Sequence, residues 1–149
     1  MTDFPKLFIP GPTHVSKDIL DVLSTKQIGH RTPEISVLID GIVSGIKNVL
    51  YTNNDVYLIS HAATGLWEIG SKNSVNKGIL HCVNGAFSSK WALSSEKCGF
   101  FTDKIDYTWG CGVKAKDVDK KLSTGKFDVF AMVHNETSTG VMSDLEDIS

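Results

Sequence analysis

The sequence predicts an α/β protein with a mostly parallel sheet. Short apolar runs alternate with helical patterns along most of the 149 residues, which calls for crossover connections between parallel strands. Clusters of small and polar residues follow two of the apolar runs, at the positions where parallel sheets bind ligands. The hydrophobic content of 41% and the charged content of 21% suit one globular domain with a continuous core.

The N-terminal segment, residues 1–32, is predicted to form an extended strap and a first helix. Ile9-Pro10-Gly11-Pro12-Thr13 places two prolines around a glycine, which excludes a helix there. A serine suited to capping and apolar residues on one side then predict a helix over Ser16–Leu23.

The longest predicted helix spans Pro33–Leu50. Its apolar residues recur at the spacing of one helix face, and Pro33 and Glu34 suit its first turn. A domain boundary is therefore predicted between residues 32 and 33, with 33–149 as the second region.

Strands and helices are predicted to alternate after residue 55. Short apolar runs predict the strands, which are Val56–Ile59, Ile79–Val83, Phe100–Tyr107 and Phe127–Val133. The helices are expected from Leu66, around Trp91 up to Cys98-Gly99, and over Lys116–Leu122.

Composition argues against several kinds of partner. A net charge of −2 gives no excess positive field, so nucleic acid is not expected. The first residues lack the pattern of a secretory signal and apolar runs are short, which predicts a cytoplasmic protein with no membrane partner. The spacing of Cys82, Cys98 and Cys111 fits neither a zinc site nor a redox pair, so buried free thiols and no metal are predicted.

Two polar clusters carry the candidate chemistry. His61–Gly65 follows the first predicted strand, and His134–Gly140 follows the last. Small residues before a helix let a phosphate approach its N–H groups, although such a turn is as often a plain connection. By itself the first cluster leaves both interpretations open.

Five short segments stand out when the chain is read in order: Pro10-Gly11-Pro12-Thr13-His14-Val15, Gly29-His30-Arg31-Thr32-Pro33-Glu34, Ala63-Thr64-Gly65-Leu66-Trp67-Glu68, Asn84-Gly85-Ala86-Phe87 and His134-Asn135-Glu136-Thr137-Ser138-Thr139-Gly140-Val141. Together they resemble the signature segments of class V aminotransferases, the serine–pyruvate, alanine–glyoxylate and serine–glyoxylate branch. The resemblance runs from about Leu7 to the last residue, and the fifth segment is the most discriminating.

The resemblance implies the fold type I architecture of pyridoxal 5′-phosphate (PLP) transferases. Residues 33–149 would then be the N-terminal part of the PLP-binding large domain, with an incomplete sheet and no C-terminal small domain. The full-length family works as a homodimer with PLP between the subunits, and its substrates are an amino acid and a 2-oxo acid.

The resemblance also assigns site residues by position. Ala63, Thr64 and Gly65 match the segment that holds the cofactor phosphate. Phe87 matches an aromatic ring stacked on the pyridine, and Thr137 matches a hydroxyl near its phenolic oxygen O3′. Glu136, next to Thr137, is expected only to brace the loop.

Gly11, His30 and Arg31 resemble segments that line the substrate entrance. The planar fork of donors on Arg31 could pair with a substrate carboxylate. A surface arginine that caps the loop before the long helix is the alternative.

The groups that make PLP reactive are not identifiable. In the family, the aspartate at the pyridine nitrogen and the Schiff-base lysine follow the fifth segment, so both are expected beyond Ser149. No residue of this chain is assigned as catalytic. We therefore expect an N-terminal segment that is inactive alone: a truncated product, a fragment, or half of a split enzyme completed by a second polypeptide.

The complete protein is expected to transfer an amino group from serine or alanine to glyoxylate or pyruvate. Within the fold, the alternative is a class V lyase resembling a cysteine desulfurase, which usually carries a histidine where this chain has Phe87. A non-catalytic phosphate- or nucleotide-binding α/β domain is the alternative of another class, although GxGxxG and GxxxxGK[ST] sequences are lacking.

Overall fold

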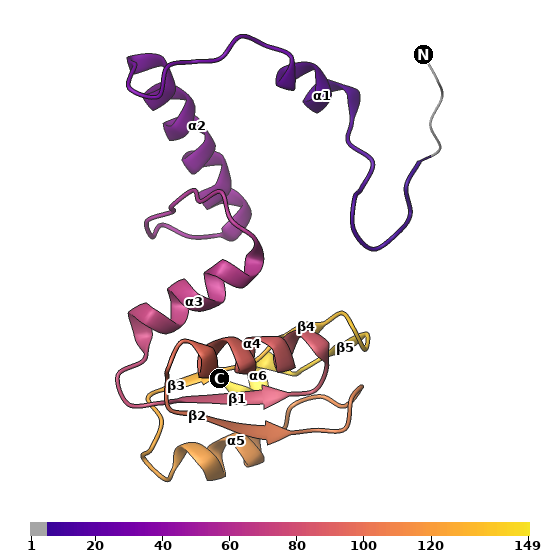
Figure 1. The fold of residues 1–149 in the computed structure, drawn as a ribbon, viewed down its shortest axis with the longest axis vertical. Coiled ribbons are helices and arrows are strands. Elements are labelled where there is room, and N and C mark those ends of the chain that lie inside the picture. The colour runs from indigo at the N-terminus through magenta and orange to yellow at the C-terminus, as the bar shows by residue number, and fades with distance from the viewer. Residues whose placement is uncertain (1–5) are drawn as a thin grey trace. The chain divides into compact units, whose positions relative to one another are not determined.

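The computed structural model describes residues 6–149, which fall into two compact units divided between Ile59 and Ser60 (Figure 1). The first unit holds two helices, and the second holds the sheet and the helices around it. The domain boundary predicted between residues 32 and 33 stays a prediction.

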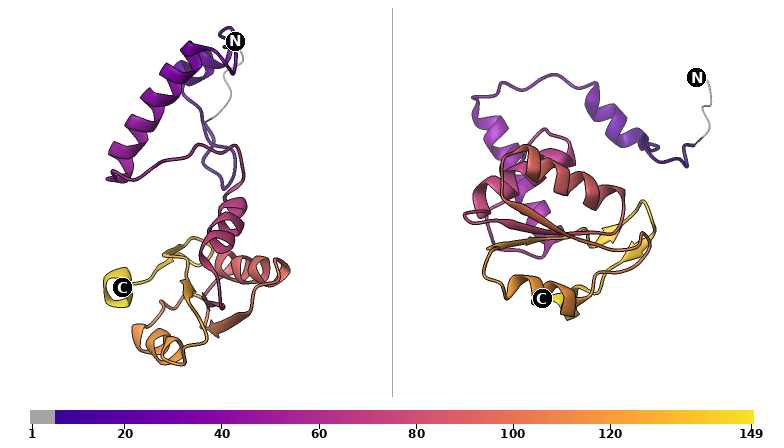
Figure 2. Two further views of the ribbon diagram at one scale, coloured as in Figure 1. Left: turned by 90° about the vertical axis from the view of Figure 1, so that its left-hand side faces the viewer. Right: turned by 60° about the horizontal axis from the view of Figure 1, so that its bottom comes forward.

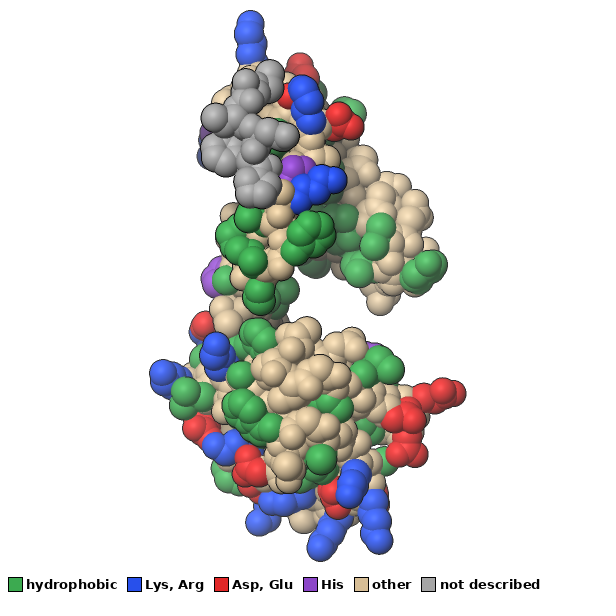
Figure 3. Space-filling view, turned by 90° about the vertical axis from the view of Figure 1, so that its right-hand side faces the viewer, with side chains coloured by type: hydrophobic (Ala, Val, Ile, Leu, Met, Phe, Trp, Pro, Cys, Tyr) green, Lys and Arg blue, Asp and Glu red, His purple; other side chains and the backbone are tan. Residues whose placement is uncertain are grey.

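The two helices of the N-terminal unit begin and end close to where the sequence predicts. Helix α1 spans Lys17–Leu23, and α2 spans Pro33–Leu50 with its proline in the first turn. Tyr51 follows α2 in the left-handed conformation, at a φ of 51°. Most apolar side chains of both helices are exposed, and Figure 3 shows hydrophobic side chains at the surface of this unit.

The strand predicted over Val56–Ile59 is wrong. The segment has no regular structure, and the side chain of Tyr57 is 80% exposed. An apolar run becomes a strand only when a neighbour accepts and donates its backbone hydrogen bonds. Within residues 6–149, the sheets that form do not include this segment.

Three parallel strands form the sheet of the C-terminal unit. Strands β1 (Ile79–Val83), β2 (Thr102–Asp106) and β3 (Val129–Ala131) lie in the order β2-β1-β3. The central strand β1 is buried at all five residues, since it has a strand on each side and a layer on each face. The predicted α/β class with a small, mostly parallel sheet is confirmed. Strand β3 is shorter than predicted and only partly buried, because it lies at an edge.

Helices cover both faces of this sheet (Figure 2). The helices of this unit are α3 (Ala63–Ser74), α4 (Ala86–Lys97), α5 (Ala115–Leu122) and α6 (Leu145–Ile148). His81 of β1 faces α4, where its Nε2 lies 2.9 Å from the Ser95 hydroxyl. The next residue, Cys82, points to the opposite face and packs against Val113 and Val118. Successive residues of β1 therefore pack against the layers on opposite faces of the sheet.

Two tryptophans join α3 to α4. The rings of Trp67 and Trp91 stack with centroids 5.8 Å apart, and the ring of Trp91 also meets His81 edge-on. Burial holds the pKa of His81 down at about 4, so the imidazole is neutral at pH 7.

The amino end of the sheet is held by one carboxylate. Asp128, just before β3, accepts hydrogen bonds of 2.9–3.1 Å from the backbone N–H groups of Asn76, Lys77 and Gly78, just before β1. These bonds lower the pKa of Asp128 to about 2. We call this contact the amino-end clamp.

The predicted burial of the cysteines is only partly right. Cys82 is buried, which raises the pKa of its thiol to about 12, whereas Cys98 is half-buried and Cys111 is exposed on a loop. Over residues 6–149, no set of His, Cys, Asp and Glu side chains gathers closely enough to bind a metal ion. The helices of the same residues are too short or too polar to span a bilayer.

Candidate functional site

The loops that leave the three parallel strands are tied together at the carboxyl end of the sheet. The Asn84 amide, after β1, donates to the Cys111 carbonyl at 3.1 Å, in the loop after β2. The Val113 N–H of that loop donates to the Ser143 hydroxyl at 3.1 Å, in the chain after β3. Parallel strands bring these loops to one edge, and the hydrogen bonds then fix their spacing.

Glu136 is the centre of this network. It lies in β4 (Asn135–Glu136), which pairs with β5 (Val141–Met142) in an antiparallel hairpin after β3. Its side chain is fully buried. One carboxylate oxygen, Oε2, accepts from the Ser88 N–H at 2.8 Å, and the other, Oε1, accepts from the Phe87 N–H at 3.2 Å.

Two serines extend the contact. The Ser138 hydroxyl donates to Glu136 Oε1 at 2.6 Å and accepts from the Ala86 N–H at 2.9 Å. The Ser88 hydroxyl lies 2.9 Å from Glu136 Oε2. The first three N–H groups of α4 are thus all bound by the loop after β3. We call this contact, made by Glu136, Ser138 and the first turn of α4, the carboxyl-end clasp.

Hydrogen bonding keeps the buried Glu136 ionised. Burial would raise the pKa of Glu136, but hydrogen bonds from Ser138, Ser88 and Phe87 outweigh burial and lower it. The partial positive charge at the start of α4 favours the same ionised form. The expectation that Glu136 braces its loop is consistent with this geometry, and the brace extends to a second loop.

The clasp brings two predicted cofactor residues onto neighbouring segments. Phe87 is the second residue of α4 and is 42% exposed, and Lys90 Nζ lies 5.6 Å from the centroid of its ring. Thr137 directly follows Glu136 and is exposed. An aromatic face and a hydroxyl are therefore both available at the surface of a hydrogen-bonded platform.

The third predicted element, Ala63–Gly65, forms the first turn of α3. No side chain of the described residues caps the start of this helix, in contrast to α4. Gly65 is buried, and a Cβ atom added to it would come within 2.0 Å of His61 Nδ1, so a larger residue would require the exposed His61 ring to move. The Gly65 N–H donates to the Ala62 carbonyl at 2.9 Å, and the N–H groups of the first turn of an α-helix otherwise have no intrahelical partner.

The residues predicted to line the substrate entrance belong to the N-terminal unit. Gly11 has a φ of 121°, which the strap's glycine tolerates and other residues rarely adopt. His30 and Arg31 are exposed in the turn before α2, where the Thr32 hydroxyl donates to the Gly29 carbonyl at 3.1 Å. Their role at an entrance stays a prediction.

Sequence reasoning missed the roles of Ser88 and Ser138. Serine is common at helix starts, so Ser88 near the beginning of α4 carried a weak local signal. Its partner stands 48 residues further along the chain, at Glu136. Local patterns do not reveal a contact of that separation.

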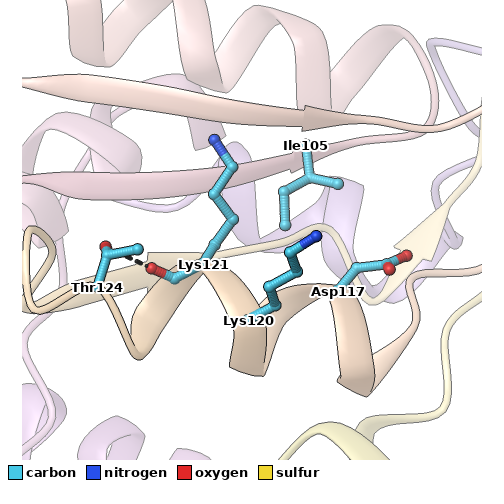
Figure 4. A pocket seen from close by; sticks show the side chains of 5 residues that line it. All are labelled: Ile105, Asp117, Lys120, Lys121 and Thr124. Carbon is cyan, nitrogen blue, oxygen red and sulfur yellow. Dashed lines mark hydrogen bonds between the residues drawn. The ribbon is translucent and has the colours of Figure 1, made fainter.

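A cavity of about 420 Å³ lies elsewhere, between α5 and β2 (Figure 4). Ile105 of β2 forms one side, and Asp117 and Lys120 of α5 reach along the other. Lys121 at the same place pairs with Asp103 at 2.6 Å. Charged side chains on the outer face of α5 line the cavity, which suits a solvated surface without a ligand.

Known proteins resemble this chain over its whole length. It is 32% identical over 151 residues to an L-aspartate–glyoxylate aminotransferase of Paracoccus denitrificans, a match that covers 97% of this chain and 38% of the relative. It is 34% identical over 155 residues to a protein named soluble hydrogenase, small subunit, of Synechococcus, covering all of this chain and 40% of the relative. No family profile matches the chain.

A solved structure has the same fold. The alanine–glyoxylate aminotransferase of Nostoc superposes on 91% of this chain with a TM-score of 0.82 at 28% identity, and 37% of that protein is covered. The chain thus spans about 38% of the length of the curated relatives it matches.

These likenesses define the fold as part of that of the aminotransferases, a class of enzymes that uses PLP. The relatives include serine–glyoxylate aminotransferases, and a neighbour in structure is an alanine–glyoxylate aminotransferase, so the predicted resemblance of the chain to part of a class V aminotransferase is confirmed.

Proposed function

We propose that this chain is the cofactor-binding N-terminal part of an aminotransferase that carries an amino group from an amino acid to a 2-oxo acid. The observation that carries the proposal is the clasp, which joins the Phe87 segment to the Thr137 segment through Glu136. The likeness to aminotransferases over the whole chain supports it.

The residues present fit PLP. The uncapped start of α3, with the Thr64 hydroxyl and the close-packed Gly65, suits the phosphate dianion. The exposed face of Phe87 suits a flat pyridine ring, and the hydroxyl of Thr137 suits O3′. When bound, PLP supplies the electron sink for breaking bonds at the amino-acid Cα.

The chain's own residues bind and orient in this proposal. The N–H groups of Ala63 and Thr64 hold a negative charge, Phe87 shields one ring face from water, and Thr137 donates a hydrogen bond. None of these groups moves a proton at Cα, so turnover requires the lysine and the aspartate that the resemblance places after Ser149. We propose that the chain alone is inactive.

The substrates follow from the resemblance. We propose serine or alanine as donor and glyoxylate or pyruvate as acceptor, with Gly11, His30 and Arg31 near the entrance of a homodimer. The Paracoccus relative carries aspartate in its name, so the donor is the least constrained part of the proposal. The other name, soluble hydrogenase, belongs to a relative that is 34% identical to this chain over 155 residues.

Binding of PLP tests the proposal directly. The purified chain is titrated with PLP and, separately, with ATP and NAD, following tryptophan emission. We expect PLP to bind and the nucleotides not to compete. Phe87→Ala should weaken PLP by about three- to tenfold, the range that an aromatic contact contributes.

Thr124→Ala, two residues after α5, is the control, since the Thr124 hydroxyl donates to the Lys121 carbonyl beside the other cavity. Binding of nucleotides in preference to PLP would support the phosphate-binding domain instead. Borohydride reduction followed by mass spectrometry adds a second arm: covalent PLP at one defined lysine of this chain would overturn the proposed inactivity.

A further inference from the structure

The cap at the start of α4 comes from an unusual place. Most helices are capped by the residue just before their first turn, with a serine, threonine, aspartate or asparagine side chain. Here that position is Gly85, and the acceptors come from Glu136 and Ser138 in another loop. A local cap would satisfy the same N–H groups without linking two parts of the chain.

The absence of a side chain at Gly85 is also explained by this long-range contact. Its φ of 178° is ordinary extended backbone, so conformation does not require glycine. A Cβ atom at this position would, however, lie 2.3 Å from Glu136 Cγ. The missing side chain therefore makes room for the carboxylate.

The main chain of Glu136 stabilises the turn that contains Thr137. Its carbonyl oxygen accepts from the N–H groups of Thr139 at 3.1 Å and Gly140 at 3.0 Å, which folds residues 136–140 into a tight turn. Thr137 lies inside that turn. One residue thus fixes the first turn of α4 by its side chain and the turn around Thr137 by its backbone.

An ionised carboxylate suits this task better than a neutral group. It accepts at both oxygens and cannot donate, so each surrounding N–H or O–H finds an acceptor. A buried hydrogen bond to a charged group is also shorter and stronger than one between neutral groups. The bond from Ser138 at 2.6 Å agrees with this.

We propose that Glu136 is a positioning residue that sets the Phe87 ring relative to the Thr137 hydroxyl. The part of the inference that concerns PLP rests on the proposed function, because it takes these two side chains as the groups around the cofactor ring. The coupling of the two segments is independent of any ligand.

The test uses two isosteric variants of the 149-residue chain, Glu136→Gln and Asp128→Asn. Each neutralises a carboxylate that accepts several backbone N–H groups, one at the carboxyl end of the sheet and one at the amino end. The amide introduced by Glu136→Gln would turn a donor toward the N–H groups of α4, whereas Asp128→Asn would disturb only the turn before β1.

The first measurement is amide hydrogen exchange without ligand. We expect Glu136→Gln to speed exchange at Phe87 and Ser88 and also at Thr139 and Gly140, while Asp128→Asn leaves all four unchanged. Faster exchange at α4 alone, or equal changes in both variants, would overturn the coupling. Ser138→Ala, which removes a smaller part of the clasp, serves in place of Glu136→Gln if that variant does not fold.

The second measurement is PLP binding by the same proteins, with the circular dichroism of the bound cofactor as a signal of ring orientation. Glu136→Gln should weaken PLP about tenfold, the lower end of the effect of losing an outer-shell partner at a metal site, and should alter the signal. Asp128→Asn should match the wild type in both. Unchanged affinity and signal in Glu136→Gln would refute positioning.

The two arms separate the two proposals. A wild-type chain that does not bind PLP contradicts the proposed function, and amide exchange then decides by itself whether Glu136 couples the segments. A wild-type chain that binds PLP while Glu136→Gln binds identically leaves the function standing and rejects the positioning role.

Discussion

At each end of the parallel sheet, one carboxylate accepts hydrogen bonds from backbone N–H groups, and the two carboxylates differ in how deeply they are buried. At the amino end, Asp128 accepts three backbone N–H groups and remains in contact with water. At the carboxyl end, Glu136 accepts a similar set while fully buried. The Asn76 N–H that binds Asp128 is open to water, whereas the Ser88 N–H that binds Glu136 is buried. We therefore expect burial, rather than the number of hydrogen bonds, to decide how much each carboxylate contributes to the free energy of unfolding.

Removal of each carboxylate gives the largest contrast. Glu136→Ala should lower the free energy of unfolding by on the order of 4 kcal/mol, because it leaves buried donors of α4 without partners. Asp128→Ala should have a clearly smaller effect in the same urea titrations. Equal losses would contradict the role given to burial.

As pH falls, we expect stability to decrease first through protonation of His81 on the central strand β1, before the carboxylates at either end of the sheet are protonated. His81 is buried and its pKa is about 4, against 6.5 in an unfolded chain. Its neutral form stabilises the fold above pH 6.5, and this contribution is lost as pH falls from 6.5 toward 4, by on the order of 3 kcal/mol.

Thermal unfolding as a function of pH measures this loss. His81→Gln, which cannot gain a proton, should flatten the profile between pH 6.5 and 4. A profile that keeps its slope in this variant would place the titration on another group.

Two glycines at opposite ends of α4 sharpen the comparison at a smaller scale. Gly85→Ala should cost about 2 kcal/mol, since its Cβ would press on Glu136 Cγ. Gly99→Ala faces open space, so only its φ of 85° opposes the change, at about 1 kcal/mol. Chemical denaturation of both variants distinguishes crowding from backbone strain; a larger loss at Gly99 would reverse the expected order.

The smallest effect concerns acid sensitivity of the amino-end clamp. The pKa of Asp128 is about 2, below the ordinary 3.8, so its ionised form adds stability above pH 3.8 and loses it as pH falls toward 2. The difference in melting temperature between wild type and Asp128→Asn should shrink across this interval. A constant difference would mean that charge is not what the clamp uses.

The sequence was a good guide wherever structure depends on neighbours along the chain. The helix Pro33–Leu50 and the strand Ile79–Val83 have the predicted bounds, because periodicity and a continuous apolar run are local signals. Val56–Ile59 carried the same kind of run and formed no strand. Whether an apolar run forms a strand depends on a neighbouring strand that pairs with it, and the residues of the run do not reveal whether that neighbour is present.

The candidate site divides in the same way. Resemblance alone pointed to Phe87 and Thr137, and the fold places their segments in contact through Glu136. The clasp joins residues 48 and 49 positions apart, so no helical or strand spacing announces it. The buried polar network at Asn84 and Ser143 depends likewise on which loops the sheet brings together.

The stacked indoles of Trp67 and Trp91 provide an intrinsic fluorescence signal near the start of α3. Trp67 stands one turn after Thr64 on α3, and the rings lie nearly parallel at 11°. Emission from such a pair responds to small changes in ring overlap. We expect an anion bound at the first turn of α3 to change the emission of this pair, which would report binding in the unlabelled chain.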